Sequence, residues 1–314
     1  MGTQLVRYKI GGEVIGMSFT VDVKNELCQI KYDRQCCMRA HLCGLAGFCG
    51  AVVIENGEEV FKMRTENKAI AQRARELIEL IFAITPEVSQ SGKICSVVIR
   101  KNVKTVLKQL GFVRGEVVKF TADPFVLHDE CCKTAFLAGA FLGGGYVRDP
   151  KDGYHFEVKT HYRTLSNDLL GIMEEIGFEA KPVVRKSEYV VYLKQSDAIC
   201  DILATIGAPD AMFEMCNMKI LKDVRNNITR KVNCDTANIT KAADAAAIQL
   251  KAIHKIKSTK GLEALPKSLE QAARLRLENP EANLTELGQM LSPPISKSGI
   301  NYRLRKIIKF AEEI

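Results

Sequence analysis

The last sixty residues of the chain carry polar and basic side chains at helical spacing. One apolar set recurs every three or four residues, which is typical of an amphipathic helix: Ile300, Leu304, Ile307, Ile308 and Ala311. The opposite face carries Ser298, Tyr302, Arg305, Lys306 and Lys309, with Asn301 and Arg303 on its flanks. Amide and guanidinium groups hydrogen-bond to base edges, and ammonium groups attract phosphate oxygens. This face predicts nucleic-acid binding; an ordinary solvated face is the alternative.

The residues of this face have separate expected roles. Backbone N–H groups at the helix start, from Ser296 to Ser298, are placed to bind a phosphate. Asn301 and Arg305 are expected to reach base edges, whereas Lys306 and Lys309 are expected to contact the DNA backbone. The full set of expected DNA-binding residues is Ser296, Lys297, Ser298, Asn301, Tyr302, Arg303, Arg305, Lys306 and Lys309.

Three short helices are predicted to position this face. Their limits are marked by Pro266 and Asn279-Pro280 for the first, Asn283 and Ser292-Pro293-Pro294 for the second, and Ser296 and Glu312 for the third. Glu286 follows Asn283 at the spacing of a capping box. Three such helices, the last with a basic outer face, predict a helix-turn-helix whose third helix enters the major groove.

A second feature is a repeat with an offset of 95 residues in the first two thirds of the chain. Residues 42–50 (LCGLAGFCG) align with residues 137–145 (LAGAFLGGG). The same offset relates Cys36-Cys37 to Cys131-Cys132. It also relates residues 61–65 (FKMRT) to residues 156–160 (FEVKT). A repeat of this length predicts a duplicated half-domain rather than a solenoid unit.

The two nine-residue segments resemble the motif of LAGLIDADG homing endonucleases. That resemblance implies duplicated α+β halves whose motif helices pack along a pseudo-twofold axis, with an acid as eighth letter that reaches a divalent metal. Here the eighth letters are Cys49 and Gly144. Neither supplies the carboxylate oxygens that Mg²⁺ prefers, so the fold is expected without its catalytic site. Close approach of the motif helices is expected at the remaining glycines: Gly44, Gly47, Gly139, Gly143 and Gly144. Two glycine-rich buried helices with no such ancestry are the alternative.

The chain is therefore expected to fold as a duplicated α+β domain, whose sheets form one outer surface, followed by an all-α helix-turn-helix domain. The expected parts are an N-terminal extension (1–16), the LAGLIDADG-like domain (17–215, with repeats at about 17–112 and 113–215), an Arg- and Asn-rich connector with a linker helix (216–258), and the helix-turn-helix domain (259–314). The linker helix, from about Thr240 to Lys257, lacks Gly and Pro and is expected to act as a semi-rigid spacer.

Charge is divided unevenly between these parts. Residues 1–216 carry 27 Lys and Arg against 27 Asp and Glu, whereas residues 217–314 carry 18 against 10. A polyanion is therefore expected to bind mainly to the last third. Lys62 and Arg64, which alternate with apolar strand positions, and Arg225 and Arg230 in the connector are possible additional DNA contacts. A solvated strand face and asparagine caps in turns are the alternatives.

Composition excludes several classes of protein. Among 314 residues, 46% are hydrophobic and 26% charged, which is typical of a soluble globular protein. The longest uncharged segments, residues 42–54 and 135–147, are too short to span a bilayer. We expect a cytoplasmic, nucleoid-associated protein with no membrane partner, no small-molecule substrate and no cofactor.

The eleven cysteines are expected to be small buried hydrophobes in a reducing cytosol. The adjacent pairs, Cys36-Cys37 and Cys131-Cys132, lack the C-x-x-C spacing of a zinc site, so no metal is expected. A metal that bridges the two pairs across the pseudo-twofold axis is the alternative.

The combination of parts resembles the WhiA family. Beside the degenerate LAGLIDADG-like domain and the connector, the resemblance depends on Leu265-Pro266, residues 277–280 (LENP), Leu284, Glu286-Leu287 and residues 296–304 (SKSGINYRL). It covers about residues 17–314. It implies a non-catalytic DNA-binding transcriptional regulator of a Gram-positive bacterium, acting in sporulation, cell division or chromosome segregation, that binds double-stranded DNA chiefly through its helix-turn-helix. Tyr302 departs from the polar, often basic, residue expected there.

Two other functions are considered. An active site-specific endonuclease would need acids elsewhere, for example Glu55, Asp149 or Asp152, none of which ends a motif helix. Alternatively, the LAGLIDADG-like domain is a protein-interaction module that docks a partner regulator while the C-terminal domain holds DNA. The zero net charge of residues 1–216 favours this role, which is compatible with DNA binding.

Overall fold

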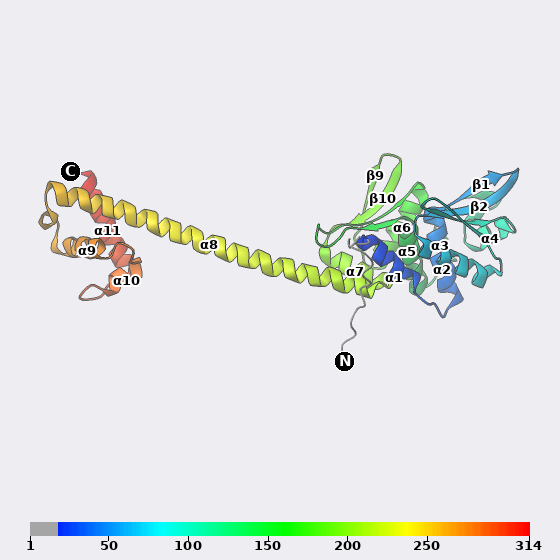
Figure 1. Cartoon of the computed structure of the whole chain (residues 1–314), viewed down its shortest axis with the longest axis horizontal. Helices are drawn as coiled ribbons and strands as arrows, with labels where there is room; N and C mark the ends of the chain where they lie inside the picture. The colour runs from blue at the N-terminus through cyan, green and yellow to red at the C-terminus, as the bar shows by residue number, and fades with distance from the viewer. Residues whose placement is uncertain (1–17) are drawn as a thin grey trace. The chain divides into compact units, whose positions relative to one another are not determined.

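The computed structural model describes residues 18–314 and divides the chain into two compact units (Figure 1). The first unit ends at Leu221 and the second begins at Lys222. The expected N-terminal extension, residues 1–16, lies outside the described residues. Each unit has a hydrophobic core of its own.

The first unit contains two copies of one order of elements, which confirms the predicted duplicated α+β fold. The first copy comprises α2 (Gln35–Cys49), β1 (Gly50–Glu55), β2 (Glu58–Thr65), α3 (Lys68–Phe82), β3 (Glu87–Ser91), β4 (Ile94–Ile99) and α4 (Val103–Gln109). The second comprises α5 (Glu130–Gly144), β7 (Gly145–Val147), β8 (Phe156–Thr160), α6 (Arg163–Glu175), β9 (Lys181–Arg185), β10 (Glu188–Leu193) and α7 (Ser196–Ile206). Helix α1 (Phe19–Cys28) precedes both copies, and the hairpin of β5 (Val113–Arg114) and β6 (Val117–Val118) lies between them.

The two four-stranded sheets have the same topology. Their strand orders are β1-β2-β4-β3 and β7-β8-β10-β9, with antiparallel neighbours throughout. Gly50 pairs with Met63 in the first sheet, and Gly145 pairs with Val158 in the second. The offset of 95 residues seen in the sequence is therefore kept in the strand register. In Figure 1 the strands of both sheets lie along one side of this unit, with α2 and α5 beneath them.

The motif helices α2 and α5 pack backbone against backbone. A Cβ atom on Gly44 would lie 2.1 Å from the carbonyl oxygen of Phe136, and one on Gly139 would lie 1.9 Å from that of His41. Both distances are far below van der Waals contact, so only glycine fits at these crossing points. The close approach predicted for these glycines is confirmed.

The other motif glycines have different neighbours. A Cβ atom on Gly143 would also meet α2, whereas one on Gly47 would meet the Leu165 side chain of α6 at 3.2 Å. A Cβ atom on Gly144 would lie 2.2 Å from the carbonyl oxygen of Lys159 in β8. The predicted approach of the motif helices was therefore wrong for Gly47, whose neighbours lie outside them, whereas Gly144 meets both β8 and the Phe48 side chain of α2.

Helix α8 (Pro209–Thr259) corrects the predicted connector, because it is a single helix of 51 residues. We expected the linker helix to begin near Thr240, with asparagine caps and turns as one alternative for the preceding segment. That start was wrong: no Gly and no Pro lies between Pro209 and Gly261, and exposed Asn side chains cost a helix little. Pro209 occupies the first helical position, where its missing N–H costs no hydrogen bond.

The second unit consists of short helices packed on the end of α8. They are η1 (Leu262–Ala264), α9 (Lys267–Glu278), α10 (Leu284–Gln289) and α11 (Lys297–Glu312). The predicted capping box is confirmed, since Asn283 Oδ1 accepts from the backbone N–H of Glu286 and the Glu286 carboxylate accepts from that of Asn283. Helices α9, α10 and α11 follow one another in the predicted order. Among residues 18–314, no helix is both long enough and apolar enough to cross a membrane.

Candidate nucleic-acid interface

Helix α11 is oriented by its apolar stripe. Ile300, Leu304, Ile307 and Ala311 are buried in the core of the second unit, as the spacing predicts. Ser296 caps the helix start, where its Oγ accepts from the backbone N–H of Gly299 at 3.2 Å. Burial of one face and capping of one end leave the opposite face and the first-turn N–H groups directed to solvent.

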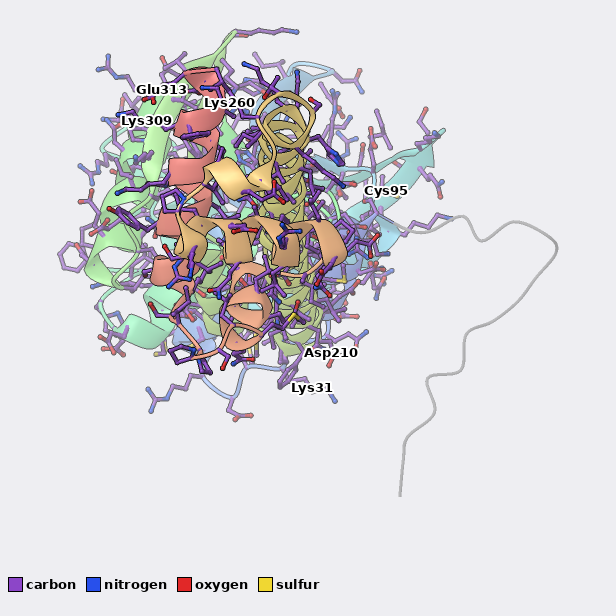
Figure 2. All side chains as sticks on the ribbon, turned by 90° about the vertical axis from the view of Figure 1, so that its left-hand side faces the viewer. Lys31, Cys95, Asp210, Lys260, Lys309 and Glu313 are labelled. Atoms are coloured by element: carbon purple, nitrogen blue, oxygen red, sulfur yellow. The ribbon has the colours of Figure 1, made fainter. Side chains whose placement is uncertain are left out.

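The solvent-directed face carries most of the predicted contacts. The exposed members are Ser296, Lys297, Ser298, Tyr302, Arg305, Lys306 and Lys309, while Asn301 is half-buried. Among residues 18–314, no carboxylate forms an ion pair with any basic side chain of α11. The Lys306 ammonium lies 4.9 Å from the centre of the Tyr302 ring. Figure 2 looks onto this unit and labels Lys309 near the end of α11. These cations are therefore available to a polyanion.

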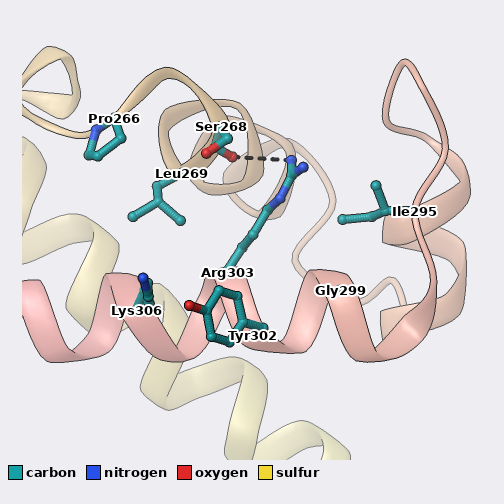
Figure 3. Close-up of a pocket in the computed structure, with 8 residues that line it drawn as sticks. All are labelled: Pro266, Ser268, Leu269, Ile295, Gly299, Tyr302, Arg303 and Lys306. Atoms are coloured by element: carbon teal, nitrogen blue, oxygen red, sulfur yellow. Dashed lines mark hydrogen bonds between the residues drawn. The ribbon is translucent and has the colours of Figure 1, made fainter.

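Arg303 differs from its neighbours. Its guanidinium reaches across to α9, where Nη1 donates to the carbonyl oxygen of Ser268 at 3.3 Å (Figure 3). This contact spans a groove between α9 and α11 lined by Pro266, Ser268, Leu269, Ile295, Gly299, Tyr302, Arg303 and Lys306. No sequence pattern pointed to Ser268, because the contact depends on how the two helices cross. Arg303 holds α9 beside the basic face and is less free than Arg305.

The two connector arginines lie on α8. Arg225 and Arg230 are both exposed side chains of this helix, upstream of the helix-turn-helix. Their exposure permits contact with a polyanion, although they are not brought onto α11.

On the first sheet, basic side chains are matched by acids. Phe61 and Met63 are buried while Lys62 and Arg64 point outward, which confirms the predicted alternation. Lys62 Nζ, however, lies 3.0 Å from a carboxylate oxygen of Glu55. The other oxygen of Glu55 lies 2.9 Å from Arg100. Hydrogen bonds from Lys62 and Arg100 lower the pKa of Glu55, so this acid stays charged and partly neutralises both bases.

The second sheet shows the same pairing of charges. Glu157 accepts hydrogen bonds from Arg185 at 2.9 Å and is 2.7 Å from the ring nitrogen of His155. Lys159 lies 3.1 Å from Glu188. The strands of both sheets thus carry several ion pairs on their outer side, with Arg64 exposed beside them.

The eighth letters of the motifs cannot act as acids. Cys49 Sγ donates to the carbonyl oxygen of Leu45 at 3.2 Å, and burial raises the pKa of this thiol to about 12. Burial lowers the pKa of the nearby Lys24 to about 8, and no sequence pattern pointed to this lysine. At Gly144, the carbonyl oxygen of Lys159 occupies the space that any side chain would need. A neutral thiol and a bare backbone therefore stand where a metal would require carboxylates.

The alternative acids have structural partners. Glu55 is held by Lys62 and Arg100. Asp149 Oδ1 accepts from the backbone N–H of Lys151 at 2.8 Å, and its carbonyl oxygen accepts from that of Asp152. Asp149 and Asp152 thus belong to the turn between β7 and β8. The three acids do not meet at the ends of α2 and α5.

Three family models match consecutive parts of the chain. They are the WhiA N-terminal LAGLIDADG-like domain at residues 35–113, the WhiA LAGLIDADG-like domain at residues 133–225, and the WhiA C-terminal HTH domain at residues 228–311.

Full-length relatives match as well. The chain is 37% identical over 310 residues to "Probable cell division protein WhiA" of Alkaliphilus metalliredigens, covering 94% of this chain and 98% of the relative. It is 38% identical over 312 residues to the protein of the same name from Clostridium novyi, covering 95% and 98%. Among solved structures, full-length DUF199/WhiA from Thermatoga maritima matches with a TM-score of 0.59 at 24% identity, covering 95% of this chain and 99% of that one. That structure supports the fold.

Proposed function

Because the chain belongs to the WhiA family, we propose that it is a sequence-specific DNA-binding regulator that acts through its helix-turn-helix. The single observation that carries this proposal is the exposed face of α11, on which basic side chains stand without acidic partners among residues 18–314. The relatives are named for cell division, and we propose a role there or in chromosome segregation or sporulation of a Gram-positive bacterium. Regulation of transcription at the nucleoid, in the cytoplasm, is part of this proposal.

The mechanism follows from the geometry of α11. Exposed N–H groups at its start can bind one phosphate, which fixes the depth of the helix in the groove. Arg305 has the length and the planar donors to read a guanine edge, whereas Lys306 and Lys309 attract backbone phosphates regardless of sequence. Tyr302, stacked beside Lys306, adds an apolar surface for sugars or a thymine methyl.

Point variants of the full chain test this division of roles. We expect Arg305→Ala to weaken binding to the preferred duplex by about 1–3 kcal/mol and to reduce preference over a scrambled duplex. Lys309→Ala is expected to weaken both duplexes alike and to lower the salt slope by about one. Fluorescence anisotropy at several salt concentrations measures both effects, on duplexes chosen by mapping the binding sites across the source genome.

Arg274→Ala is the matched control. Arg274 is an exposed arginine of α9 that forms ion pairs with Glu263 and Glu270. Arg274→Ala therefore lowers the net charge by the same amount as Arg305→Ala but removes a base that already has acidic partners. Equal losses for Arg274→Ala and Arg305→Ala would show that general charge, rather than the α11 face, determines binding.

We also propose that the protein does not cleave DNA. The acid positions of both motifs lack carboxylates, and the alternative acids are engaged in ion pairs (Glu55) or belong to a turn (Asp149 and Asp152). Incubation of clean protein with its target duplex in Mg²⁺ or Mn²⁺ is expected to leave the duplex intact. Nicking that depends on metal and disappears in Glu55→Ala, Asp149→Ala or Asp152→Ala would support the endonuclease alternative instead.

A second role is proposed for the first unit. Its strand faces present ion pairs rather than a free basic surface, which favours a protein partner over a polyanion. We propose that this face docks another regulatory protein while α11 holds DNA. Cross-linking in cells of the source organism is expected to join the sheet face to a second protein; cross-links from this face to DNA alone would contradict this role.

A further inference from the structure

Four cysteine thiols meet at the start of the motif helices. The Sγ atoms of Cys36, Cys37, Cys131 and Cys132 all lie within 4.8 Å of one another. Cys37 and Cys132 are buried, and Cys36 and Cys131 are half-buried. No metal was expected from the sequence because each pair lacks C-x-x-C spacing, and a metal that bridges the two pairs was the alternative. That spacing rule concerns ligands from one segment, whereas the fold brings together two segments 95 residues apart.

The duplicated fold explains why the thiols converge. Each pair occupies the second and third positions of its helix, since α2 begins at Gln35 and α5 at Glu130. Because the two helices pack closely, their starts bring the pairs together. Arg34, directly before α2, places its Nη1 3.8 Å from Cys131 Sγ.

We propose that these four cysteines form a tetrathiolate site for Zn²⁺ that joins the two halves of the LAGLIDADG-like domain. Zinc bonds of about 2.3 Å to sulfur in a tetrahedron place the sulfur atoms about 3.8 Å apart. The observed upper limit of 4.8 Å is about one ångström longer, a gap that small χ1 rotations close. Cys36 and Cys37 Sγ are already 4.0 Å apart. Binding deprotonates the thiols and releases their protons to solvent.

This site is separate from the metal position of a homing endonuclease. The degenerate acid positions, Cys49 and Gly144, are the last residues of α2 and α5. A helix of 15 residues is about 22 Å long, so the thiol cluster lies at the opposite end of the helix pair. Four ligands from the protein also close the coordination shell, which is typical of a structural zinc site rather than a catalytic one.

Ligand chemistry distinguishes this proposal from a neighbouring group. His128, Asp129 and Cys132 also lie within 4.8 Å of one another, but they offer three ligands, of which two are exposed. The nearest side-chain partner of His128 is the carboxylate of Asp129, at 3.3 Å. Four soft thiolates bind Zn²⁺ more strongly than one thiolate with a hard carboxylate, so the cysteine set is favoured. The His128→Ala variant distinguishes the two groups, because it removes a ligand from the second group and leaves the four cysteines in place.

The experiment measures metal directly in the full chain. Protein purified without chelators is analysed for zinc by mass spectrometry and then loaded with Co²⁺, whose thiolate charge-transfer bands report sulfur ligands. We expect about one zinc ion per chain and the spectrum of a tetrahedral cobalt tetrathiolate. Cys131→Ser, at a half-buried thiol, is expected to lose most of the metal, whereas Cys234→Ser on α8 and His128→Ala are expected to retain it.

Stability gives a second measurement. Removing zinc with a chelator is expected to lower the thermal midpoint of the first unit, and adding Zn²⁺ is expected to restore it in the parent and in Cys234→Ser but not in Cys131→Ser. Two results would overturn the proposal: protein that takes up no zinc with all four thiols free, or protein in which these cysteines form disulfides and reduction yields thiols that take up no zinc. Retention of metal by Cys131→Ser together with its loss in His128→Ala would equally overturn it.

Discussion

The two units of this protein differ in whether their outward-pointing basic side chains have acidic partners. In the first, outward-pointing bases such as Lys62 and Lys159 are matched by Glu55 and Glu188. In the second, the bases of α11 face solvent without acidic partners among the residues that the structure describes. The second unit, residues 222–314, also carries 17 Lys and Arg against 10 Asp and Glu. A polyanion therefore meets a neutralised surface on one unit and an open one on the other.

The first unit keeps the helix packing of a LAGLIDADG-like fold, while the eighth letters of its motifs carry no carboxylate. Packing between α2 and α5 still depends on Gly44 and Gly139, where backbones touch. At the eighth letters, the Cys49 thiol donates to the carbonyl oxygen of Leu45, and the carbonyl oxygen of Lys159 occupies the space that a side chain at Gly144 would need. The small helix-turn-helix needs only one buried stripe and two caps to present its basic face. Changes in the first unit should thus affect stability, and changes on α11 should affect DNA binding.

The largest expected effect is on the helix crossing. Gly139→Ala would place a Cβ atom 1.9 Å from the His41 carbonyl oxygen, so α2 and α5 must separate. We expect the free energy of unfolding to fall by about 3 kcal/mol or more. Gly171→Ala on α6 is the control, because its Cβ atom would meet no atom within 4 Å and should stabilise the helix slightly. Urea unfolding compares the two; equal stabilities would show that the crossing is not as tight as described.

A pH dependence is expected from the same crossing. Burial lowers the pKa of His41 from 6.5 to about 3, so the folded protein keeps this ring neutral where the unfolded chain takes a proton. The contribution of this pKa difference to the free energy of unfolding is fully present above pH 6.5. It is lost as the pH falls toward 3, by up to about 1.4 kcal/mol per pH unit. Between pH 7 and 5 the loss is about 2 kcal/mol. His41→Asn should reduce this dependence in urea unfolding, and an unchanged slope in the variant would assign it to other groups.

The smallest expected effect concerns the start of α11. Ser296→Ala removes the hydrogen bond to the backbone N–H of Gly299 and should cost about 1 kcal/mol of stability in the second unit. Ser298→Ala, one residue inside the helix, should cost less because Ser298 is not the cap. Thermal unfolding of both variants provides the comparison. If Ser298→Ala proves the more harmful, the helix begins elsewhere.

The sequence predicted the repeat, the motif helices and the helix-turn-helix because each depends on local spacing. The offset of 95 residues recurs in the register of the two sheets. Asn283 and Glu286 form the predicted capping box, and Ser296 caps α11 as predicted. Long-range contacts could not be predicted, among them the Arg303 hydrogen bond to Ser268. The start of α8 was misplaced because the turn preference of asparagine was given too much weight in a segment where no Gly or Pro interrupts the helix.

The central claim is that α11 rather than the ancestral nuclease surface holds DNA. Fluorescence anisotropy on one labelled target duplex, at several salt concentrations, compares the full chain with residues 222–314 and residues 18–221. We expect the C-terminal fragment to bind within about tenfold of the full chain with a similar salt slope, and the N-terminal fragment to bind at least about a hundredfold more weakly. If residues 18–221 alone bind as tightly as the full chain, with the same salt dependence, the sheet face is the DNA-binding surface and the roles of the two units are reversed.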